Sequence, residues 1–520
     1  MICLRISSNS KWSWEKQPAP IPASEITRTI DIDVVVIGAG LSGMCAALAA
    51  KEAGAAPILI EKNSTFSARG SHNAAFGSKL QHKLGININY RRVIRDLVAW
   101  AQGRLKEELL WLFARKSGTC MDWLIDIAEA GGMQVGLWDG YYKGHEYTEY
   151  PVTHIFYVPE KPDDSWNYGL AKVLESTIKS RGIQIHYNTP AVRLIREGGG
   201  PVTGVIAGTP GNYTRYNTSR GVIIASGDYS SNREMLKRYN PFALQADAQI
   251  YFPQTTNVGE VHQIAMWVGG AMQKYEPHSA VIHLEAGAMS YFFLHVNAHG
   301  KRFKNEDVNT QAKSCSKEFQ PGGIAWAVYD ADGLSYVQKN VAAGIGGGLF
   351  WDQVNRLMGE EWDLEAEQKM LDEHIKTGKV VTADTIEELA KKMRVPADNL
   401  KATVDRYNEL VDLKDDPDFG KRPELLTPIK RPPFYAGRLL STVLTASGGL
   451  RTNTRCEVLD EYDRPIKNLY VAGSAAGDFF ANDYPTICPG IGHGRCITFG
   501  RLAGTIAAGK SVDTIPSKEI

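Results

Sequence analysis

Residues 34–62 constrain this fold more than any other part of the chain, because an apolar run, a glycine motif and a small-residue helix follow one another directly. The run 34–37 predicts a buried parallel strand that leads into the GxGxxG motif Gly38-Ala39-Gly40-Leu41-Ser42-Gly43. A helix is expected over 44–53, and a second strand over 57–60 ends at Glu61. This succession is the βαβ fingerprint of a dinucleotide-binding fold.

Each part of the fingerprint has a chemical role. Gly38 permits a tight turn, Gly40 lets the backbone approach a pyrophosphate, and Gly43 lets helix and strand pack closely. The N–H groups and the positive dipole end of the helix favour phosphate. Glu61, 18 residues after Gly43, can accept hydrogen bonds from both ribose hydroxyls and disfavours the 2′-phosphate of NADP. The nucleotide-binding positions predicted here are Gly38, Gly40, Leu41, Ser42, Gly43, Glu61 and Lys62.

Composition favours a large enzyme over a nucleic-acid or membrane-surface protein. A chain of 520 residues predicts two or more domains. Lys plus Arg and Asp plus Glu are 58 each, so the formal net charge is zero. No apolar stretch approaches the roughly 20 residues that span a bilayer, and residues 1–30 have no apolar signal core, so we expect an N-terminal arm there.

Cysteine usage argues against a metal centre. The seven cysteines are dispersed and form no CxxC pair, so neither a zinc nor an iron–sulfur site is expected, and we predict no metal ligands. Such a dispersed set of thiols is typical of a reducing compartment, which predicts a cytoplasmic location.

The far end of the chain identifies the dinucleotide as FAD. A short strand over 469–472 leads to Gly473, and after Pro489-Gly490-Ile491-Gly492 a helix is expected over 493–508. FAD is long enough to contact both ends of the chain, with its ADP half on the opening fingerprint. The start of the last helix would then face the pyrimidine edge of the flavin and stabilise the negative charge of the reduced ring.

Segments between the two ends agree with FAD. A strand with an irregularity at Pro190 is expected over 183–196, followed by a glycine turn, a returning strand over 202–207 and another strand in 221–228 that ends in glycine. Small residues in 70–78 would let a flavin lie against the backbone. The further predicted FAD contacts are Gly70, Ser71, His72, Asn73, Val192, Ala225, Gly227, Gly473, Gly490, Ile491 and Gly492.

Changes in residue composition along the chain indicate three parts. Residues 1–275 and 436–520 would form the FAD-binding domain, and 276–435 an inserted substrate cap with charged helices over 361–376, 385–394 and 399–413. The polar segment 413–424 is expected to act as a hinge. An apolar stripe over 97–127, with residues three and four apart, predicts core helices.

These motifs resemble a known group of flavoproteins. The opening fingerprint and residues 225–239, 296–306, 447–478 and 494–504 are similar to the fumarate reductase/succinate dehydrogenase flavoprotein superfamily, which includes aspartate oxidases and 3-ketosteroid dehydrogenases. The likeness covers nearly all of 30–510. It implies an α/β fold with a Rossmann-like FAD-binding domain of the glutathione-reductase type and an inserted α+β cap, which can move to admit substrate above the flavin.

The active-site positions depart from those of the fumarate-type members. The resemblance implies a proton-donating arginine after the strand 324–330, a histidine before Gly448 and an Asn-Arg pair before the last helix. This chain has no arginine over 331–336. It has Leu444-Thr445-Ala446-Ser447 before Gly448, without a histidine, and Asn482-Asp483 where the Asn-Arg pair is expected. Arginine is the side chain best suited to clamp carboxylates. We therefore expect no fumarate reductase, succinate dehydrogenase or aspartate oxidase activity.

The loop before the last helix resembles that of 3-ketosteroid dehydrogenases. Those enzymes carry Tyr-Pro and then Pro-Gly-Gly, and here Tyr484-Pro485 precedes Pro489-Gly490-Ile491 with two additional residues between. The resemblance implies that Tyr484 and a backbone N–H near Gly490 polarise a substrate carbonyl. The alternative is that Tyr484 packs on the flavin without a chemical role.

Other catalytic roles stay open at the level of sequence. A second group must move the proton next to the carbonyl; the candidates are Tyr157, Tyr251, Tyr291, His278, His283 and His295, with Tyr157 and Tyr251 put forward as catalytic. His72 lies where succinate dehydrogenase-type flavoproteins attach FAD covalently, whereas many relatives bind FAD non-covalently. His493 and Arg495 could face either the flavin or solvent.

The sequence thus predicts an FAD-dependent oxidoreductase that acts on CH–CH or C=C bonds conjugated to a carbonyl. Aromatic residues in 138–157, 291–293 and 479–480 favour a cyclic or aromatic substrate. The direction, reduction or dehydrogenation, is open, and electrons are expected to pass to or from a separate carrier. The alternatives are a flavin oxidase of an amine or hydroxy acid, or a flavin electron carrier without a small substrate.

Overall fold

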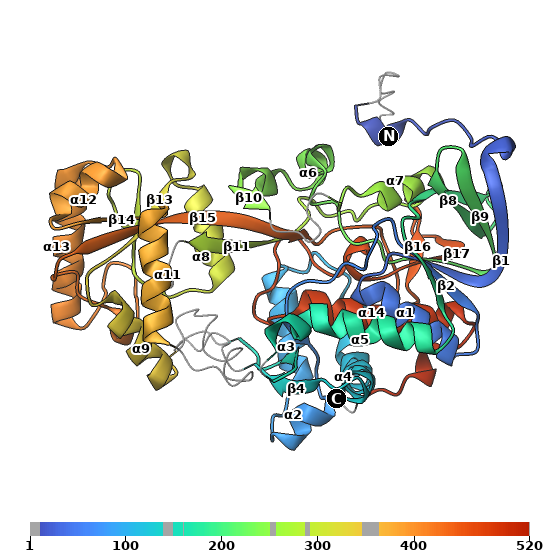
Figure 1. Ribbon diagram of the computed structural model, residues 1–520, viewed down its shortest axis with the longest axis horizontal. Coiled ribbons are helices and arrows are strands. Elements are labelled where there is room, and N and C mark those ends of the chain that lie inside the picture. The colour runs from blue at the N-terminus through green and yellow to red at the C-terminus, as the bar shows by residue number, and fades with distance from the viewer. Residues whose placement is uncertain are drawn as a thin grey trace.

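The computed structural model describes residues 11–138, 149–159, 161–249, 256–286, 292–345 and 363–518. It has two lobes (Figure 1). The lobe on the right of Figure 1 contains the first and last parts of the chain, and the lobe on the left is formed by its yellow and orange part. Strand β15 (Phe434–Ala446) runs from one lobe to the other.

The larger sheet has a parallel centre with strands from both ends of the chain, in the order β17-β9-β1-β2-β6. Ile37 at the end of β1 pairs with Ile60 and with Ile224, so the carboxyl ends of three strands meet at one edge. This arrangement confirms the expected α/β class. Its strands are β1 (Ile26–Ile37), β2 (Pro57–Ile60), β6 (Gln184–His186), β7 (Ala191–Arg196), β8 (Val202–Thr209), β9 (Asn212–Ile224), β16 (Glu457–Leu459) and β17 (Pro465–Val471).

The strand expected over 183–196 is divided in two. β6 joins the parallel centre beside β2, and β7 pairs with β8 in the antiparallel extension. The break falls at 187–190, where Asn188 has a φ of 52° and Pro190 lacks the N–H that a central strand needs.

Helices α1 (Leu41–Glu52) and α14 (Ile491–Ala507) pack backbone against backbone. A Cβ atom on Gly504 would lie 2.1 Å from the carbonyl oxygen of Ala46, and one on Gly500 would lie 2.4 Å from that of Ser42. Only glycine permits so close an approach. The contact brings the starts of the first and last long helices together at the carboxyl edge of the sheet.

A layer of helices covers the face of the sheet that α1 and α14 occupy (Figure 1). The predicted apolar stripe is buried there, including Leu97, Leu109, Phe113, Leu124 and Ile127. A small three-stranded sheet lies next to this layer. The elements are β3 (Asn73–Ala74), α2 (Lys79–Lys83), α3 (Tyr90–Trp100), α4 (Glu107–Ala130), β4 (Gln134–Leu137), β5 (Thr153–Tyr157) and α5 (Trp166–Ser180).

The second lobe is organised around β15, which pairs with β10, β11, β13 and β14. The domain limit proposed between 435 and 436 therefore falls inside a strand, and β10 precedes the proposed cap. The charged helices of the cap lie close to their expected positions. The elements are β10 (Ala248–Gln249), β11 (Ala280–Ala286), β12 (Leu294–Asn297), α8 (Thr310–Glu318), β13 (Ala325–Tyr329), α9 (Gly333–Ala343), α11 (Leu364–Lys376), β14 (Val380–Ala383), α12 (Ile386–Met393) and α13 (Ala397–Leu413).

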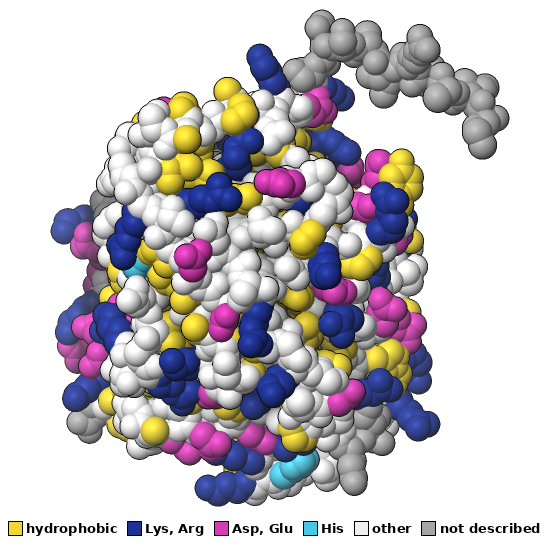
Figure 2. Space-filling view, turned by 90° about the vertical axis from the view of Figure 1, so that its right-hand side faces the viewer, with side chains coloured by type: hydrophobic (Ala, Val, Ile, Leu, Met, Phe, Trp, Pro, Cys, Tyr) yellow, Lys and Arg dark blue, Asp and Glu magenta, His cyan; other side chains and the backbone are white. Residues whose placement is uncertain are grey.

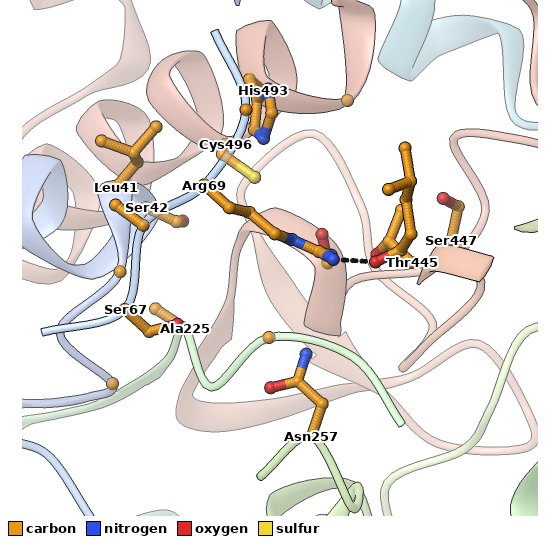
Figure 3. A pocket seen from close by; sticks show the side chains of 18 of the residues that line it. Leu41, Ser42, Ser67, Arg69, Ala225, Asn257, Thr445, Ser447, His493 and Cys496 are labelled. Carbon is orange, nitrogen blue, oxygen red and sulfur yellow. Dashed lines mark hydrogen bonds between the residues drawn. The ribbon is translucent and has the colours of Figure 1, made fainter. Parts of the chain in front are cut away.

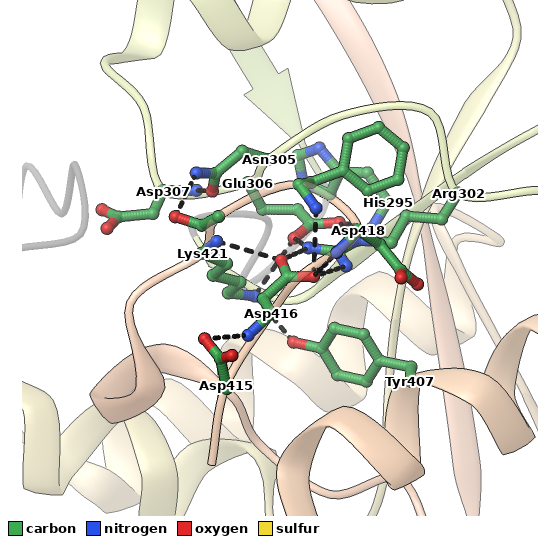
Figure 4. A network of polar contacts seen from close by, with 12 residues as sticks. His295, Arg302, Asn305, Glu306, Asp307, Tyr407, Asp415, Asp416, Asp418 and Lys421 are labelled. Carbon is green, nitrogen blue, oxygen red and sulfur yellow. Dashed lines mark hydrogen bonds and ion pairs between the residues drawn. The ribbon is translucent and has the colours of Figure 1, made fainter. Parts of the chain in front are cut away.

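Buried charges replace the hinge expected over 413–424. Arg302 donates to Glu306 and to Asp416 at distances of 2.7–3.0 Å, and Lys421 lies 3.3 Å from Glu306 (Figure 4). Although burial opposes ionisation, Lys421 and Arg302 hold the pKa of Glu306 below its usual value. A network in which every charge has a partner fixes this segment to the cap, because breaking it would leave a buried charge uncompensated.

The N-terminal arm is anchored by tryptophans on α6 (Arg233–Tyr239) and α7 (Glu260–Trp267). Trp14 is buried, stacks on Tyr239 with a centroid separation of 6.0 Å, and accepts a 2.7 Å hydrogen bond from Trp267 through its carbonyl oxygen. The arm therefore packs on the first lobe, as the sequence predicted.

The face of the first lobe shown in Figure 2 carries interspersed basic and acidic side chains, in keeping with the balanced composition. In the described part of the chain, no helix is both long and apolar enough to cross a bilayer.

The contact between α1 and α14 is testable with one methyl group. We expect Gly504→Ala to lower the free energy of unfolding by about 1–3 kcal/mol, because the helices must separate to admit it. The control Gly199→Ala adds the same methyl in a turn with nothing within 4 Å, and should stay within about 0.5 kcal/mol of wild type. Equal urea midpoints for the two variants would contradict this packing.

Candidate active site

A cavity of about 380 Å³ lies where the two lobes meet, a volume within the range of small-molecule sites. Its walls come from both chain ends and from the cap side. The first lobe contributes Trp138, Glu149, Ser474 and residues within 37–42, 60–63, 67–72, 189–191, 225–227, 256–261 and 484–496. The cap side contributes Val281, Asn309, Gln311 and residues within 444–447.

The glycine motif has the geometry that its sequence predicts. Gly38 has a φ of 108°, and a Cβ on it would lie 2.5 Å from the carbonyl oxygen of Ala225. A Cβ on Gly43 would lie 1.9 Å from the oxygen of Gly38, so Gly43 serves helix packing and does not line the cavity. These contacts place the start of α1 directly at the cavity wall.

This end of the cavity fits a nucleotide diphosphate. No side chain caps the N-terminus of α1, and the buried hydroxyl of Ser42, which lines the cavity, lacks a hydrogen-bond partner. Uncapped N–H groups, a helix dipole and an unsatisfied hydroxyl together form an anion site. A pyrophosphate would satisfy all three.

Glu61 is buried at the edge of the same wall. Its Oε2 accepts a 2.8 Å hydrogen bond from the Ala39 N–H, and its Oε1 accepts from the backbone and side chain of Asn63 at 2.8–2.9 Å. These bonds hold the carboxylate in the place where an adenosine ribose would be read, next to the glycine turn.

Residues 70–74 lie against the start of α14. Gly490 has a φ of 82°, and a Cβ on it would lie 2.6 Å from the carbonyl carbon of His72. The Ala74 N–H donates to the Gly490 oxygen at 3.1 Å. His493 donates from Nδ1 to the His72 carbonyl oxygen at 2.9 Å, and desolvation lowers the pKa of His493 to about 4. The imidazole of His493 is therefore neutral.

Tyr484 lines the cavity beside the N-terminus of α14. Its hydroxyl oxygen accepts a 2.8 Å hydrogen bond from the Gly492 N–H, and α14 has no side-chain cap. Burial raises the pKa of Tyr484, so the hydroxyl keeps its proton at neutral pH. This proton is the donor that the hydroxyl can offer to a bound molecule.

Two guanidinium groups line the cavity in positions that sequence reasoning did not settle. Arg495, which could have faced solvent, is only 2% exposed and lines the cavity. Arg69, which sequence reasoning missed, extends from the wall near Ser67 towards the segment that carries Thr445 and Ser447 (Figure 3). It donates to the Leu444 carbonyl oxygen and lies 3.8 Å from Asp228. A basic residue beside predicted flavin-contacting glycines was the one available signal for Arg69.

The structure brings most of the predicted positions together at this cavity. Those that line it are Gly38, Gly40, Leu41, Ser42, Glu61, Lys62, Gly70, Ser71, His72, Ala225, Gly227, Tyr484, Gly490 and Gly492. The predicted positions that do not line it are Gly43, Asn73, Val192, Gly473 and Ile491. Asn73 instead donates to Asn167 at 2.7 Å. Ala191 lines the cavity in place of Val192.

The proton-transfer candidates are dispersed. Tyr157 is in β5 and does not line the cavity; Tyr251, Tyr291 and the side chain of His283 lie outside the described residues. His278 is hydrogen-bonded to the Tyr229 hydroxyl at 2.5 Å, and burial lowers its pKa to about 3. His295 is in the cap on β12, and neither histidine lines the cavity.

Comparison with known proteins agrees with this geometry. The chain matches the FAD binding domain family over residues 33–485 and belongs to it. It is 26% identical to vinyl phenol reductase of Lactiplantibacillus plantarum over 504 residues, which cover 92% of this chain and 96% of that one. It is also 26% identical to urocanate reductase of Eggerthella lenta over 513 residues, covering 95% and 77%.

The fold is shared with a solved 3-ketosteroid-Δ4-(5α)-dehydrogenase of Rhodococcus jostii, in complex with 4-androstene-3,17-dione, at a TM-score of 0.71 and 22% identity over 94% of this chain and 99% of that one. The family match and the curated relatives confirm the predicted superfamily, the FAD cofactor and the assignment as an FAD-dependent oxidoreductase. The residues that hold FAD remain a proposal based on the cavity.

We expect Glu61→Gln to weaken FAD binding by about 10- to 100-fold, the usual effect of losing a hydrogen bond to a charged group. FMN affinity should be unchanged, because FMN has no adenosine ribose. Titration of the flavin-free protein measures both constants, with Glu52→Gln on the exposed end of α1 as the control. Wild-type FAD affinity in Glu61→Gln would remove Glu61 from the site.

Proposed function

We propose that this flavoprotein reduces, or introduces, a C=C bond conjugated to a carbonyl group in a small cyclic or aryl-bearing substrate. The observation that carries the proposal is the Tyr484 hydroxyl, which lies in the cavity wall 2.8 Å from the Gly492 N–H. The two relatives named as reductases of vinyl phenol and of urocanate support a C=C bond as the reacting group.

The chain prepares the carbonyl for reaction through Tyr484. Because the tyrosine oxygen accepts from Gly492, its own proton is left to donate to a substrate oxygen. The N-terminus of α14 adds positive electrostatic potential near the substrate oxygen. A donor held in a fixed position stabilises negative charge as it develops on that oxygen. FAD, when bound, supplies the two-electron redox group.

The other lining residues suit a partly apolar substrate. Trp138 and Val281 are buried in the wall, and Leu444 lies on the cap side. These side chains exclude water and can contact a ring. The polar groups on the cap side of the lining are uncharged: Asn309, Gln311, Thr445 and Ser447. This neutral lining supports a substrate other than a dicarboxylate.

We also propose a separate electron carrier and a cytoplasmic location. The sequence has one βαβ fingerprint with a terminal carboxylate, and the ADP half of FAD would occupy it. Cys45, Cys120, Cys456 and Cys488 are unpaired and buried, which suits a reducing compartment.

The direct test is anaerobic. The holoenzyme flavin is reduced chemically and mixed with a panel of enones, enoates and ketosteroids, and flavin absorbance is followed. Rapid reoxidation by a conjugated C=C compound is the expected result. Reoxidation by oxygen alone, with hydrogen peroxide formed from an amine or hydroxy acid under turnover, would point to an oxidase instead.

Tyr484→Phe should lower the rate of this reoxidation by roughly 100-fold or more, the effect of losing one oxyanion donor. Tyr157→Phe, the same substitution outside the cavity, should react as wild type. Thermal midpoints and FAD content of both variants show whether the loss of the acceptor for Gly492 has disturbed the fold. A normal rate in Tyr484→Phe with intact FAD would exclude the proposed role.

A further inference from the structure

Arg495 is a buried cation without an anionic partner. Its side chain is 2% exposed, and its hydrogen bond is a 3.3 Å donation from Nη1 to the Ala476 carbonyl oxygen. Its Nε has no partner, and no carboxylate of the described residues lies within ion-pair distance. The guanidinium instead lies over the rings of Phe480 and Phe479, at 4.6 and 5.7 Å from their centroids.

A charge in this state is costly unless something compensates it. Burial lowers the pKa of Arg495, yet a guanidinium remains protonated in proteins. Arg302 in the cap, by contrast, is paired with Glu306 and Asp416. Cation–π contacts offset only part of the desolvation. Because Arg495 lines the cavity, an anionic ligand bound there would supply the missing counter-charge.

The surroundings of Arg495 identify the anion. It lies in the second turn of α14, whose start is uncapped and whose Gly492 N–H holds Tyr484. A carboxylate has two oxygens, so one can accept from Tyr484 and the other from Arg495. The second guanidinium of the cavity, Arg69, is already engaged with Leu444 and lies near Asp228.

We propose that Arg495 binds the carboxylate of the substrate, so that the conjugated carbonyl is that of an unsaturated monocarboxylic acid. This inference rests on the proposed function and names its substrate class. A single free guanidinium suits one carboxylate, and the apolar wall with Trp138, Val281 and Leu444 suits the remainder of the molecule. Arg495 is thus the specificity-determining residue of the site.

The test compares two probes of similar shape on the FAD-loaded enzyme. Benzoate carries the carboxylate and benzamide is neutral; their binding is followed by the shift of the oxidised-flavin spectrum. Wild type should bind benzoate at least tenfold more tightly than benzamide. Arg495→Gln should weaken benzoate by about 10- to 100-fold and leave benzamide unchanged, and Arg495→Lys should retain part of the preference.

Arg501→Gln is the matched control on the same helix. Arg501 donates to the Thr119 oxygen at 3.0 Å, lies over Trp123 and does not line the cavity. It should keep the benzoate preference. The flavin midpoint potential and the FAD content should be the same in wild type and Arg495→Gln, since the proposal places the arginine on the substrate and not on the flavin.

Three results would overturn the inference: equal affinities for benzoate and benzamide in the wild type, equal weakening of both probes in Arg495→Gln, or a changed flavin potential with the benzoate preference kept. The first needs no variant, so a variant that fails to fold does not protect the inference. Benzoate selectivity without turnover of any C=C compound would contradict the proposed function alone. Turnover of enones with no benzoate preference would contradict the role of Arg495 alone.

Discussion

The contact between α1 and α14 is the constraint on which the cavity depends. Gly500 and Gly504 let the last long helix touch the backbone of the first at Ser42 and Ala46. The strands before these helices, β1 and β17, lie on either side of β9 in one sheet, and both end opposite Ile224 of β9. Two segments from opposite ends of the chain therefore start their helices at one place. A side chain at either glycine would separate them.

The distribution of charge separates structural from functional groups. In the cap, Arg302, Glu306 and Asp416 compensate one another, and the network needs no further ligand. At the cavity, two helix starts lack caps, Ser42 has an unsatisfied hydroxyl and Arg495 lacks a counter-charge. Buried polar groups are usually satisfied, and a ligand in the cavity would satisfy these. The negative charges implied are the pyrophosphate of FAD at one end and, by our proposal, a carboxylate at the other.

Sequence reasoning reached the parts of the fold that follow from local chemistry. In the opening βαβ unit, Gly38 marks the turn, Gly43 marks the close packing of helix and strand, and Glu61 marks the end of the second strand. The role of the far end was also predictable, because a strand, a glycine turn and a helix start recur there. The course of β15 was not, since a strand that serves two lobes carries no local mark of where one lobe ends.

The candidate site was predictable only in part, for a related reason. Tyr484 could be placed from its loop, whereas the direction of Arg495 depends on Phe479 and Phe480 packing beneath it. Arg69 reaches Leu444 across a long sequence separation that no periodicity reveals. The polar segment around Asp416 resembled a hinge because its partner Arg302 is distant in sequence. Tertiary contacts of this kind decide which charges are buried.

The central claim is that both ends of the chain hold one FAD. Its most direct test is to digest the purified protein and identify and quantify the flavin by mass spectrometry. The account predicts one FAD per chain, either free or attached to the peptide that contains His72. FMN in its place, or a protein that takes up no flavin on reconstitution, would contradict it.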